Sequence, residues 1–393
     1  MAHMKKRKQV DDKKAVGKVG KKSNREKNKN VVVSQESLYI CKEEIPYLSE
    51  EIIHNILAEL PFDSLLNSRL VCKLWSNIIS NPFVTYSSLL QSEPGLIIQQ
   101  KKMSKEAHFK TYFMAMQDEQ ITVREFSIPC IGNIYYSCNG LVLLEGKQDN
   151  LCIANFVTKQ QVTLPCHTLL DVFSISLGFA FVPSRGEYKV VHLYENDDGE
   201  QYLRFEILTL GSDKWRHVDL PPFALRFHLG MGDIPISVKG FLHWYSSPLD
   251  SMDSILSMDV CDEKIYNTSL PSCSGQVELL NIGGFLSLLS KDFLKLTLSI
   301  WVLKDSYKGI WVNQLQIDLG GMLRLYTLRT VGFLSLKNGK VIILRRHCNK
   351  SESCYYAYDI EHHRMWQVAI NIKNERRYAM THVNSLISWE TIQ

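Results

Sequence analysis

The residues that could carry chemistry form no familiar catalytic pattern in this sequence. There is no HExxH zinc-binding pair, no GxSxG nucleophile turn and no GxxxxGK[ST] phosphate loop. The segment Leu229–Asp233 holds two glycines of a dinucleotide-binding pattern, but it lacks the third glycine and a following helix, so it predicts a turn. We therefore expect a non-catalytic chain that needs no cofactor or metal.

Histidines and cysteines are the remaining candidates for metal binding, and their spacing argues against it. His362 and His363 stand near Asp359 and Glu361 between two strand-like segments. Neighbouring residues on a strand point to opposite faces, so a hairpin turn is the prediction there. The ten cysteines include no CxxC pair, which favours free, mostly buried thiols over a zinc site or a disulfide framework.

The first element that could position functional side chains is a helical segment over residues 47–79. Ser49 predicts a helix N-cap, apolar residues then recur at helical spacing, and Pro61 ends this first helix. Asp63 predicts the N-cap of a second helix, and a third short helix is expected before Pro82. Three short helices cannot bury this many large apolar side chains among themselves, so some must face a partner or the rest of the chain.

This segment resembles an F-box, the module that docks a protein onto a Skp-type adaptor of a cullin-based ubiquitin ligase. One departure is Ser49, where the family usually has proline. The resemblance is carried by Leu48, Glu51-Ile52-Ile53, Ile56-Leu57, Leu60-Pro61, Ser64-Leu65-Leu66, Arg69, Val71-Cys72-Lys73, Trp75, Ile78-Ile79 and Pro82-Phe83. It implies that the adaptor is contacted by Leu48, Ile52, Ile53, Ile56, Leu57, Leu60, Pro61, Leu65, Leu66, Val71, Cys72, Trp75 and Ile78.

After Leu90 the sequence changes to short runs of Val, Ile, Phe, Tyr and Leu separated by turn residues, which predicts strands. A glycine followed by a large apolar residue recurs, and we interpret each occurrence as the inner strand of one repeat. These glycines are Gly140, Gly178, Gly240, Gly284 and Gly332. Units of several strands that cannot bury their faces alone are typical of β-propeller blades.

The two ends of the strand-rich region are incomplete in a complementary way. The strands predicted within residues 96–128 lack an inner strand, and residues 381–390 form an inner strand without a blade. Joining the two gives a sixth blade and removes an exposed sheet edge. The predicted fold is therefore mainly β, with a small three-helix N-terminal module and a propeller of six blades. A pair of β-sandwiches is the alternative.

The strand-rich region resembles the F-box-associated domain of plant F-box proteins, a relative of the kelch propellers. The resemblance is carried by residues 137–142, 177–179, 187–191, 238–244 and 300–303. Its motifs are mostly structural, so candidates for target binding come from the predicted loops at the start of the inner strands, over residues 166–174, 221–235, 271–278, 320–327 and 371–380. Aromatic and arginine side chains are the usual anchors of interfaces, although packing of the loops is the alternative role. The candidates are Phe173, Phe223, Arg226, Phe227, His228, Tyr326, Arg376, Arg377 and Tyr378.

The N-terminus differs from the rest of the chain in charge and composition. Residues 1–30 carry twelve Lys or Arg and three acidic residues, a local charge of +9, within a chain of net charge +4. They contain no aromatic residue, which predicts disorder. The lysine clusters resemble a nuclear localisation signal, and loose affinity for polyanions such as nucleic acid is the alternative. The predicted parts are a basic tail (1–37), an F-box module (38–90) and a propeller-like domain (91–393).

Taken together, the two resemblances imply the substrate-recognition subunit of a Skp–cullin–F-box ubiquitin ligase. Its F-box would dock a Skp-type adaptor and through it a cullin, and its β domain would bind an unidentified protein substrate. The chain has no apolar run long enough to span a bilayer and no signal-peptide core, so we expect a soluble protein of nucleus and cytoplasm. A non-degradative F-box scaffold and a nuclear polyanion-binding protein are the alternatives.

Overall fold

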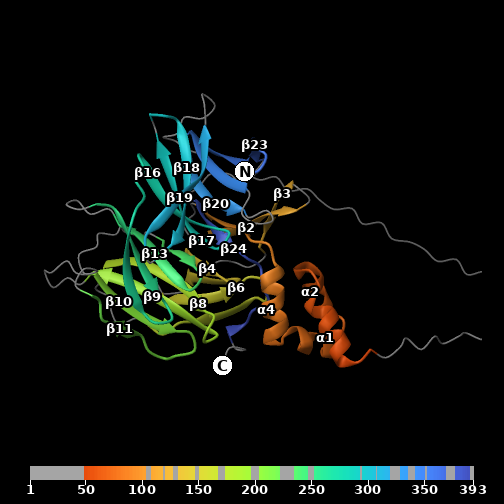
Figure 1. Cartoon of the computed structure of the whole chain (residues 1–393). Helices are drawn as coiled ribbons and strands as arrows, with labels where there is room; N and C mark the ends of the chain where they lie inside the picture. Colours follow the sequence, from red (N-terminus) through yellow and green to blue (C-terminus); the bar gives the residue numbers. More distant parts are fainter. Residues whose placement is uncertain are drawn as a thin grey trace, which may run out of the picture. The chain divides into compact units, whose positions relative to one another are not determined.

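The computed structural model of the chain describes residues 48–102, 108–117, 120–126, 132–146, 150–166, 173–195, 203–221, 234–246, 252–292, 294–306, 308–318, 328–334, 341–349, 352–368 and 377–389. Four helices come first and strands follow (Figure 1). The helices are α1 (Glu50–Ala58), α2 (Phe62–Ser68), α3 (Lys73–Ile79) and α4 (Pro82–Gln91). In the described part of the chain no helix is long and apolar enough to cross a membrane.

The helix starts follow from residues that satisfy free backbone N–H groups. Ser49 caps α1 as predicted, because its hydroxyl accepts from the Ile52 N–H. The predicted cap at Asp63 is wrong. α2 already begins at Phe62 after Pro61, and Asp63 lies in its first turn, where a carboxylate suits the helix dipole.

A fourth helix is the main departure from the predicted three-helix module. Asn81 caps α4, with its side-chain oxygen accepting the Phe83 N–H at 2.8 Å, and Pro82 occupies the first helical turn. Asparagine at the N-cap followed by proline is a recognised helix-start signal. The sequence therefore carried the information for this helix, which our interpretation of Pro82 as a terminator missed.

The strands form six four-stranded antiparallel sheets, which are the six blades of a β-propeller. Within each blade the strands are given from the innermost outwards. The first blade is β4 (Ile134–Cys138), β5 (Leu141–Glu145), β6 (Leu151–Asn155) and β7 (Gln160–Thr163). The second is β8 (Phe173–Val182), β9 (Glu187–Glu195), β10 (Leu203–Thr209) and β11 (Arg216–Val218). The third is β12 (Ile236–Val238), β13 (Phe241–Ser246), β14 (Ser254–Asp259) and β15 (Lys264–Ser269).

The remaining blades include the one that joins the chain ends. The fourth is β16 (Gln276–Ile282), β17 (Phe285–Asp292), β18 (Thr297–Asp305) and β19 (Ile310–Asp318). The fifth is β20 (Leu328–Leu334), β21 (Val341–Asn349), β22 (Glu352–Asp359) and β23 (Arg364–Val368). The sixth is β24 (Arg377–His382), β1 (Gly95–Lys102), β2 (His108–Gln117) and β3 (Gln120–Glu125).

The predicted closure of the ring is confirmed. β24 pairs antiparallel with β1, so that Gly95 lies opposite His382 and Gln100 opposite Arg377. Each innermost strand contacts the innermost strand of the next blade, including β24 with β4. The closing strand ends at His382, whereas we expected residues 381–390, and the chain continues beyond it as an irregular segment over 383–389.

The glycine repeat marks two different structural positions, which corrects our reading of it as five inner strands. Three of the glycines, Gly140, Gly240 and Gly284, are the second residues of two-residue turns between the first and second strands of a blade. Both residues of these turns have positive φ, the type I′ geometry that suits the twist of a hairpin. Gly178 and Gly332 lie inside the innermost strands β8 and β20.

Antiparallel connectivity gives the propeller two distinct faces. Turns between first and second strands and between third and fourth strands lie on one face of the propeller. The helices pack on the same face. Val157, in the β6–β7 turn, packs against the helical core, and Tyr86 of α4 contacts the Phe181 ring near the end of β8. We call this face the helix face. The other turns and the connections between blades lie on the opposite face, which we call the far face.

Candidate functional site

The residues predicted to contact the adaptor divide into three groups by their exposure. The exposed ones are Leu48, Ile52, Ile56, Pro61, Val71 and Cys72. The partly buried ones are Ile53, Leu60, Leu66 and Trp75. The buried ones are Leu57, Leu65 and Ile78. Only the first two groups offer surface to another molecule.

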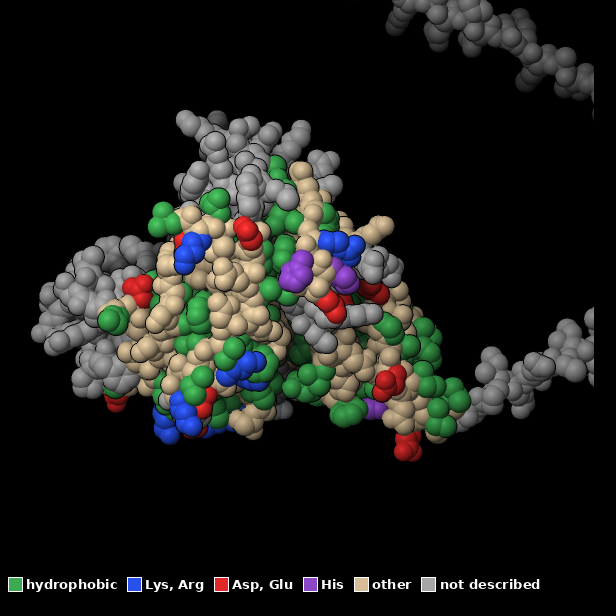
Figure 2. All heavy atoms as spheres, turned by 45° about the horizontal axis from the view of Figure 1, so that its top comes forward, with side chains coloured by type: hydrophobic (Ala, Val, Ile, Leu, Met, Phe, Trp, Pro, Cys, Tyr) green, Lys and Arg blue, Asp and Glu red, His purple; other side chains and the backbone are tan. Residues whose placement is uncertain are grey.

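An apolar stripe runs along the outer side of α1. Ile52 and Ile56 are four residues apart, which places them on one side of the helix, and Leu48 stands just before the Ser49 cap. Leu48, Ile52 and Ile56 are 43%, 47% and 46% exposed. Their neighbours Glu50 and Glu51 are exposed as well. Figure 2 shows this mixture of hydrophobic and acidic side chains on the helical part of the molecule. A contiguous exposed apolar stripe marks an interaction surface.

The connection between α2 and α3 adds a second exposed apolar group. Leu70 is 86% exposed and Val71 62%, and Leu74 in the first turn of α3 is 37% exposed. Val71 was predicted as a contact residue, whereas Leu70 and Leu74 were missed. Leu70 lies beyond α2, which ends at Ser68, so the helical periodicity of α2 does not extend to it.

The three buried residues of the predicted set hold the helices together. Leu57, Leu65 and Ile78 share one apolar cluster with Ile79, Val84 and, from the far end of the chain, Leu386. Leu57 and Leu65 have no exposed surface, so their role in this structure is packing. They keep α1, α2 and α3 in place and thereby position the exposed stripe.

Most of the predicted target-binding residues lie outside the described residues. These are Phe223, Arg226, Phe227, His228, Tyr326 and Arg376. The backbone of Phe173 begins β8, and those of Arg377 and Tyr378 begin β24, but their side chains are not among the described ones. The described strand ends that flank the five predicted loops all lie on the far face. The prediction for that face therefore stays a prediction.

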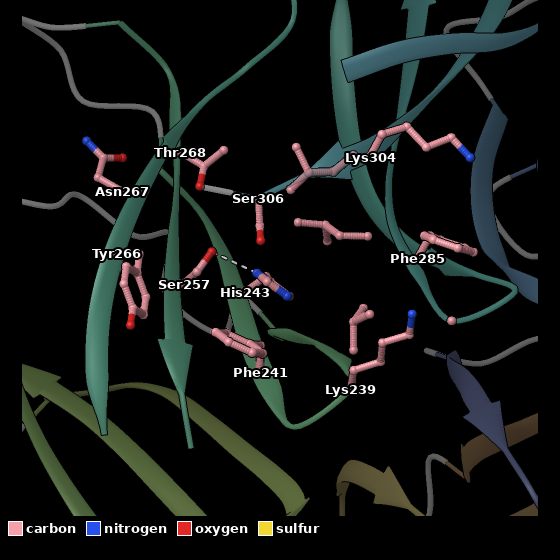
Figure 3. A pocket seen from close by; sticks show the side chains of 14 residues that line it. Lys239, Phe241, His243, Ser257, Tyr266, Asn267, Thr268, Phe285, Lys304 and Ser306 are labelled. Atoms are coloured by element: carbon pink, nitrogen blue, oxygen red, sulfur yellow. Dashed lines mark hydrogen bonds between the residues drawn. The ribbon is translucent and has the colours of Figure 1, made fainter. Parts of the chain in front are cut away.

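A pocket of about 330 Å³ lies between the third and fourth blades. It is bordered by the β12–β13 turn, by the β16–β17 turn and by the end of β18, so it opens on the helix face. Its walls come from Val238, Leu286 and Leu303 and from the aromatic residues Phe241, Tyr266 and Phe285. Figure 3 shows Phe241 and Tyr266 on the third blade and Phe285 on the fourth.

Two lysines stand at one exposed aromatic ring of this pocket. The Nζ atoms of Lys239 and Lys304 lie 4.5 and 4.9 Å from the centroid of the Phe285 ring, within the range of cation–π attraction. Phe285 is 41% exposed. No Asp or Glu lines the pocket among the described residues, and neither lysine has a carboxylate partner there. Glu263, in the β14–β15 turn, is engaged by Lys189 and Arg216 instead.

The floor of the pocket holds a histidine–serine pair. His243 Nδ1 and Ser257 Oγ are 2.7 Å apart, and both side chains are almost fully buried (Figure 3). Burial lowers the pKa of His243 to about 4, so its ring is neutral at pH 7. In the described part of the chain no carboxylate orients this histidine, so the pair lacks the third member of a hydrolytic triad. Sequence reasoning missed this pocket because its residues come from two blades.

The paired histidines lie where the sequence predicted a turn. Residues 360–363 form the turn between β22 and β23, and Asp359 accepts the backbone N–H groups of Glu361 and His362. His362 Nδ1 also lies 2.8 Å from the Asp359 carboxylate. The hairpin prediction is confirmed. Among the described residues no group of three His, Cys, Asp or Glu side chains could hold a metal ion. Leu229 lies outside the described residues, as do Gly230, Met231, Gly232 and Asp233.

Comparison with known protein families supports both parts of this description. Residues 88–389 match the family described as F-box associated beta propeller domain. Residues 45–86 match the F-box domain. The F-box match spans α1 to α3 and the first half of α4, and the match to the propeller family spans all six blades.

Curated proteins of Arabidopsis thaliana are similar over most of their length. F-box protein At4g19940 is 25% identical over 376 residues, which cover 84% of this chain and 88% of that protein. F-box protein At5g65850 is 27% identical over 348 residues, covering 81% and 83%. F-box/kelch-repeat protein At4g19930 is 24% identical over 356 residues, covering 78% of each chain.

Proposed function

Because this chain belongs to the F-box proteins with an F-box associated β-propeller domain, we propose that it is the substrate-recognition subunit of a Skp–cullin–F-box ubiquitin ligase. The helices bind a Skp-type adaptor, the adaptor connects them to a cullin, and the propeller holds the target protein. The observation that supports this proposal is the exposed apolar stripe of α1, which stands on helices whose own core is already filled by Leu57 and Leu65.

The proposal assigns the chain a binding role. F-box proteins are typically adaptors without catalytic activity, and ubiquitin transfer is carried out by other subunits of such ligases. The Ser257–His243 pair is the nearest approach to a catalytic constellation among the described residues, and it has no orienting carboxylate. Target capture and adaptor docking are therefore the two activities to measure.

Co-purification of the full chain with a Skp-type adaptor tests the proposal. We expect a complex at micromolar concentration, and we expect Ile52→Asp to weaken it by about 2 kcal/mol or more, because a charge would replace an apolar anchor of a packed interface. Leu294→Asp is the matched control, since Leu294 is an exposed leucine in the β17–β18 turn on the far face. Failure of the native chain to bind any Skp-type adaptor would contradict the proposal.

A non-degradative scaffold would bind the adaptor equally well, so a second measurement is needed. Proteins captured by the propeller should accumulate in cells that express the chain without residues 48–91. Under a scaffold role their abundance would not change. This comparison separates recognition for degradation from assembly alone.

For localisation we propose nucleus and cytoplasm, with residues 1–30 directing part of the protein to the nucleus. The support is their local charge of +9 and their lysine clusters. Deleting residues 1–30 should shift a fluorescent fusion towards the cytoplasm without changing adaptor affinity. Nucleic-acid binding that falls steeply with salt and vanishes on the same deletion would favour the polyanion-binding alternative instead.

A further inference from the structure

We propose that the pocket between the third and fourth blades binds an acidic segment of the target polypeptide, with one carboxylate at Lys239, another at Lys304 and an intervening apolar side chain against Phe285. This inference rests on the proposed function, because it states the chemistry of the target that the propeller would hold. It places a contact site on the helix face, whereas our sequence-based candidates lie on the far face.

The charge of the pocket calls for an anion. Two ammonium groups reach the same aromatic ring from adjacent blades, and Figure 3 shows Lys239 and Lys304 on opposite sides of Phe285. Neither ammonium group has a carboxylate partner among the described residues of the pocket. Lys189 and Lys291 show the contrast, because these buried lysines lie 2.8 and 3.1 Å from Glu263 and Glu278. A bound carboxylate would supply the missing partner.

The backbone at Lys239 strengthens the case for a functional lysine. Lys239 occupies the first position of a type I′ turn with φ of 49°, where asparagine and glycine are favoured. The equivalent positions of the first and fourth blades hold Asn139 and Gly283. A lysine held in a left-handed conformation costs stability locally, and such residues cluster at functional sites. Its Cε lies 3.6 Å from where a Cβ on Gly284 would stand, so the side chain spans from the third blade to the fourth.

The shape and apolar content of the pocket favour a peptide over a small free anion. The walls include Val238, Leu286 and Leu303, and the Phe285 ring at the rim is 41% exposed. A simple anion held by the lysines would leave this apolar surface in water. A peptide that places a leucine or similar side chain beside its carboxylate would cover it. His243, neutral on the floor, can form a hydrogen bond with the peptide but adds no charge.

The test uses the purified full chain and three labelled peptide pools, followed by fluorescence anisotropy. In the acidic pool a leucine is flanked by aspartate and glutamate, in the amide pool by asparagine and glutamine, and in the basic pool by lysine and arginine. We expect binding of the acidic pool alone, weakening as salt rises. Citrate without peptide serves as the competitor that represents a small free anion.

Two substitutions separate loss of binding from loss of folding. Lys239→Asn removes the charge and restores the Asn-Gly turn seen at Asn139 and Gly140, so it should raise the melting temperature while lowering affinity. In the double variant Lys239→Asn with Lys304→Gln, affinity for the acidic pool should fall roughly five- to tenfold, the effect of losing two partly exposed ion pairs. Lys214→Gln is the matched control, because Lys214 is an exposed lysine in the β10–β11 turn on the same face of the propeller.

Three results would overturn the inference: equal binding of the acidic and amide pools, unchanged affinity in the double variant, or displacement of the peptide by citrate at concentrations near the peptide's own dissociation constant. Adaptor binding is measured separately on the same variants and should be unaffected. If the chain binds the acidic pool but no Skp-type adaptor, the pocket stands and the ligase proposal fails. If it binds the adaptor but not the acidic pool, the ligase proposal stands and the inference about the pocket fails.

Discussion

Single residues of the helical part separate into those that hold it together and those that face outward. Leu65 is fully buried, so Leu65→Ala should lower the free energy of unfolding by about 2–5 kcal/mol. Ile56 is 46% exposed, so Ile56→Ala should change stability by less than about 1 kcal/mol while weakening adaptor binding. Urea unfolding and adaptor titration measure both quantities on each variant. Equal destabilisation by the two substitutions would contradict this division.

A second residue-scale prediction concerns His382 in the closing strand β24. Its Nδ1 lies 2.7 Å from the Ser137 hydroxyl of β4, and its Nε2 is buried. Its ring packs nearly perpendicular to the rings of Phe113 and Phe126. Burial lowers its pKa to about 3 from an ordinary value near 6.5. The folded state therefore favours the neutral ring, and its stabilisation is complete above pH 6.5 and is lost as the pH falls towards 3.

The measurement compares the native chain with His382→Gln, which keeps a hydrogen-bonding side chain but does not titrate. Below pH 6.5 the stability advantage of the native chain should shrink by about 1.4 kcal/mol per pH unit. The buried His243 titrates in the same direction in both proteins, so it cancels in the comparison. A constant difference between pH 7 and pH 4.5 would mean that His382 is not held neutral.

At the scale of elements, the contribution of the turns on the helix face to stability can be tested. Gly140 has φ of 84°, and a Cβ there would collide with the side chain of Ser385 in the C-terminal segment. Gly186 has φ of 67° in the β8–β9 turn, with nothing within 4 Å of such a Cβ. Gly140→Ala should therefore destabilise the chain by about 1–3 kcal/mol more than Gly186→Ala, because Gly186→Ala introduces backbone strain but no steric clash. Thermal unfolding of both variants decides this.

The elements also show what could be predicted from the sequence and what could not. Local signals gave the α1 cap at Ser49, the run of strands and the closing of the ring by the C-terminus. The missed α4 had a local signal too, in Asn81 and Pro82, that we read as a stop. The position of each glycine repeat within a blade depends on strand pairing, which periodicity does not contain. The pocket at Phe285 forms only where two blades meet, so no local sequence pattern could predict it.

On the scale of the whole molecule, the C-terminal segment joins three parts of the structure. Asn155, which is fully buried in the first blade, donates from Nδ2 to the carbonyl oxygens of Ser385 and Ile387 at 3.0 and 2.9 Å. The Ser385 hydroxyl donates to the carbonyl of Asn139 at 2.6 Å. Leu386 packs into the core of the helices. The chain end thus closes the propeller through β24 and then binds the first blade to the helical part.

This arrangement changes what a C-terminal truncation should do. The predicted division into an F-box module (38–90) and a propeller-like domain (91–393) would leave adaptor binding intact when the propeller is opened. Because Leu386 belongs to the same apolar cluster as Leu57 and Leu65, removing residues 377–393 should damage both parts. β1 would lose its pairing partner and expose a strand edge, and the helical core would lose a large side chain.

The prediction is that this truncated chain aggregates or melts at a lower temperature and binds a Skp-type adaptor more weakly than the full chain. Leu386→Ala isolates the helical contribution, because it keeps β24 and both hydrogen bonds from Asn155 Nδ2 to the carbonyls of Ser385 and Ile387. It should destabilise the chain by about 2–4 kcal/mol and lower adaptor affinity while the propeller still binds its ligand. Deletion of residues 1–37 is the control for shortening the chain and should leave both measurements unchanged. If Leu386→Ala leaves stability and adaptor affinity intact, the helices are held by their own contacts and the C-terminal segment serves the propeller alone.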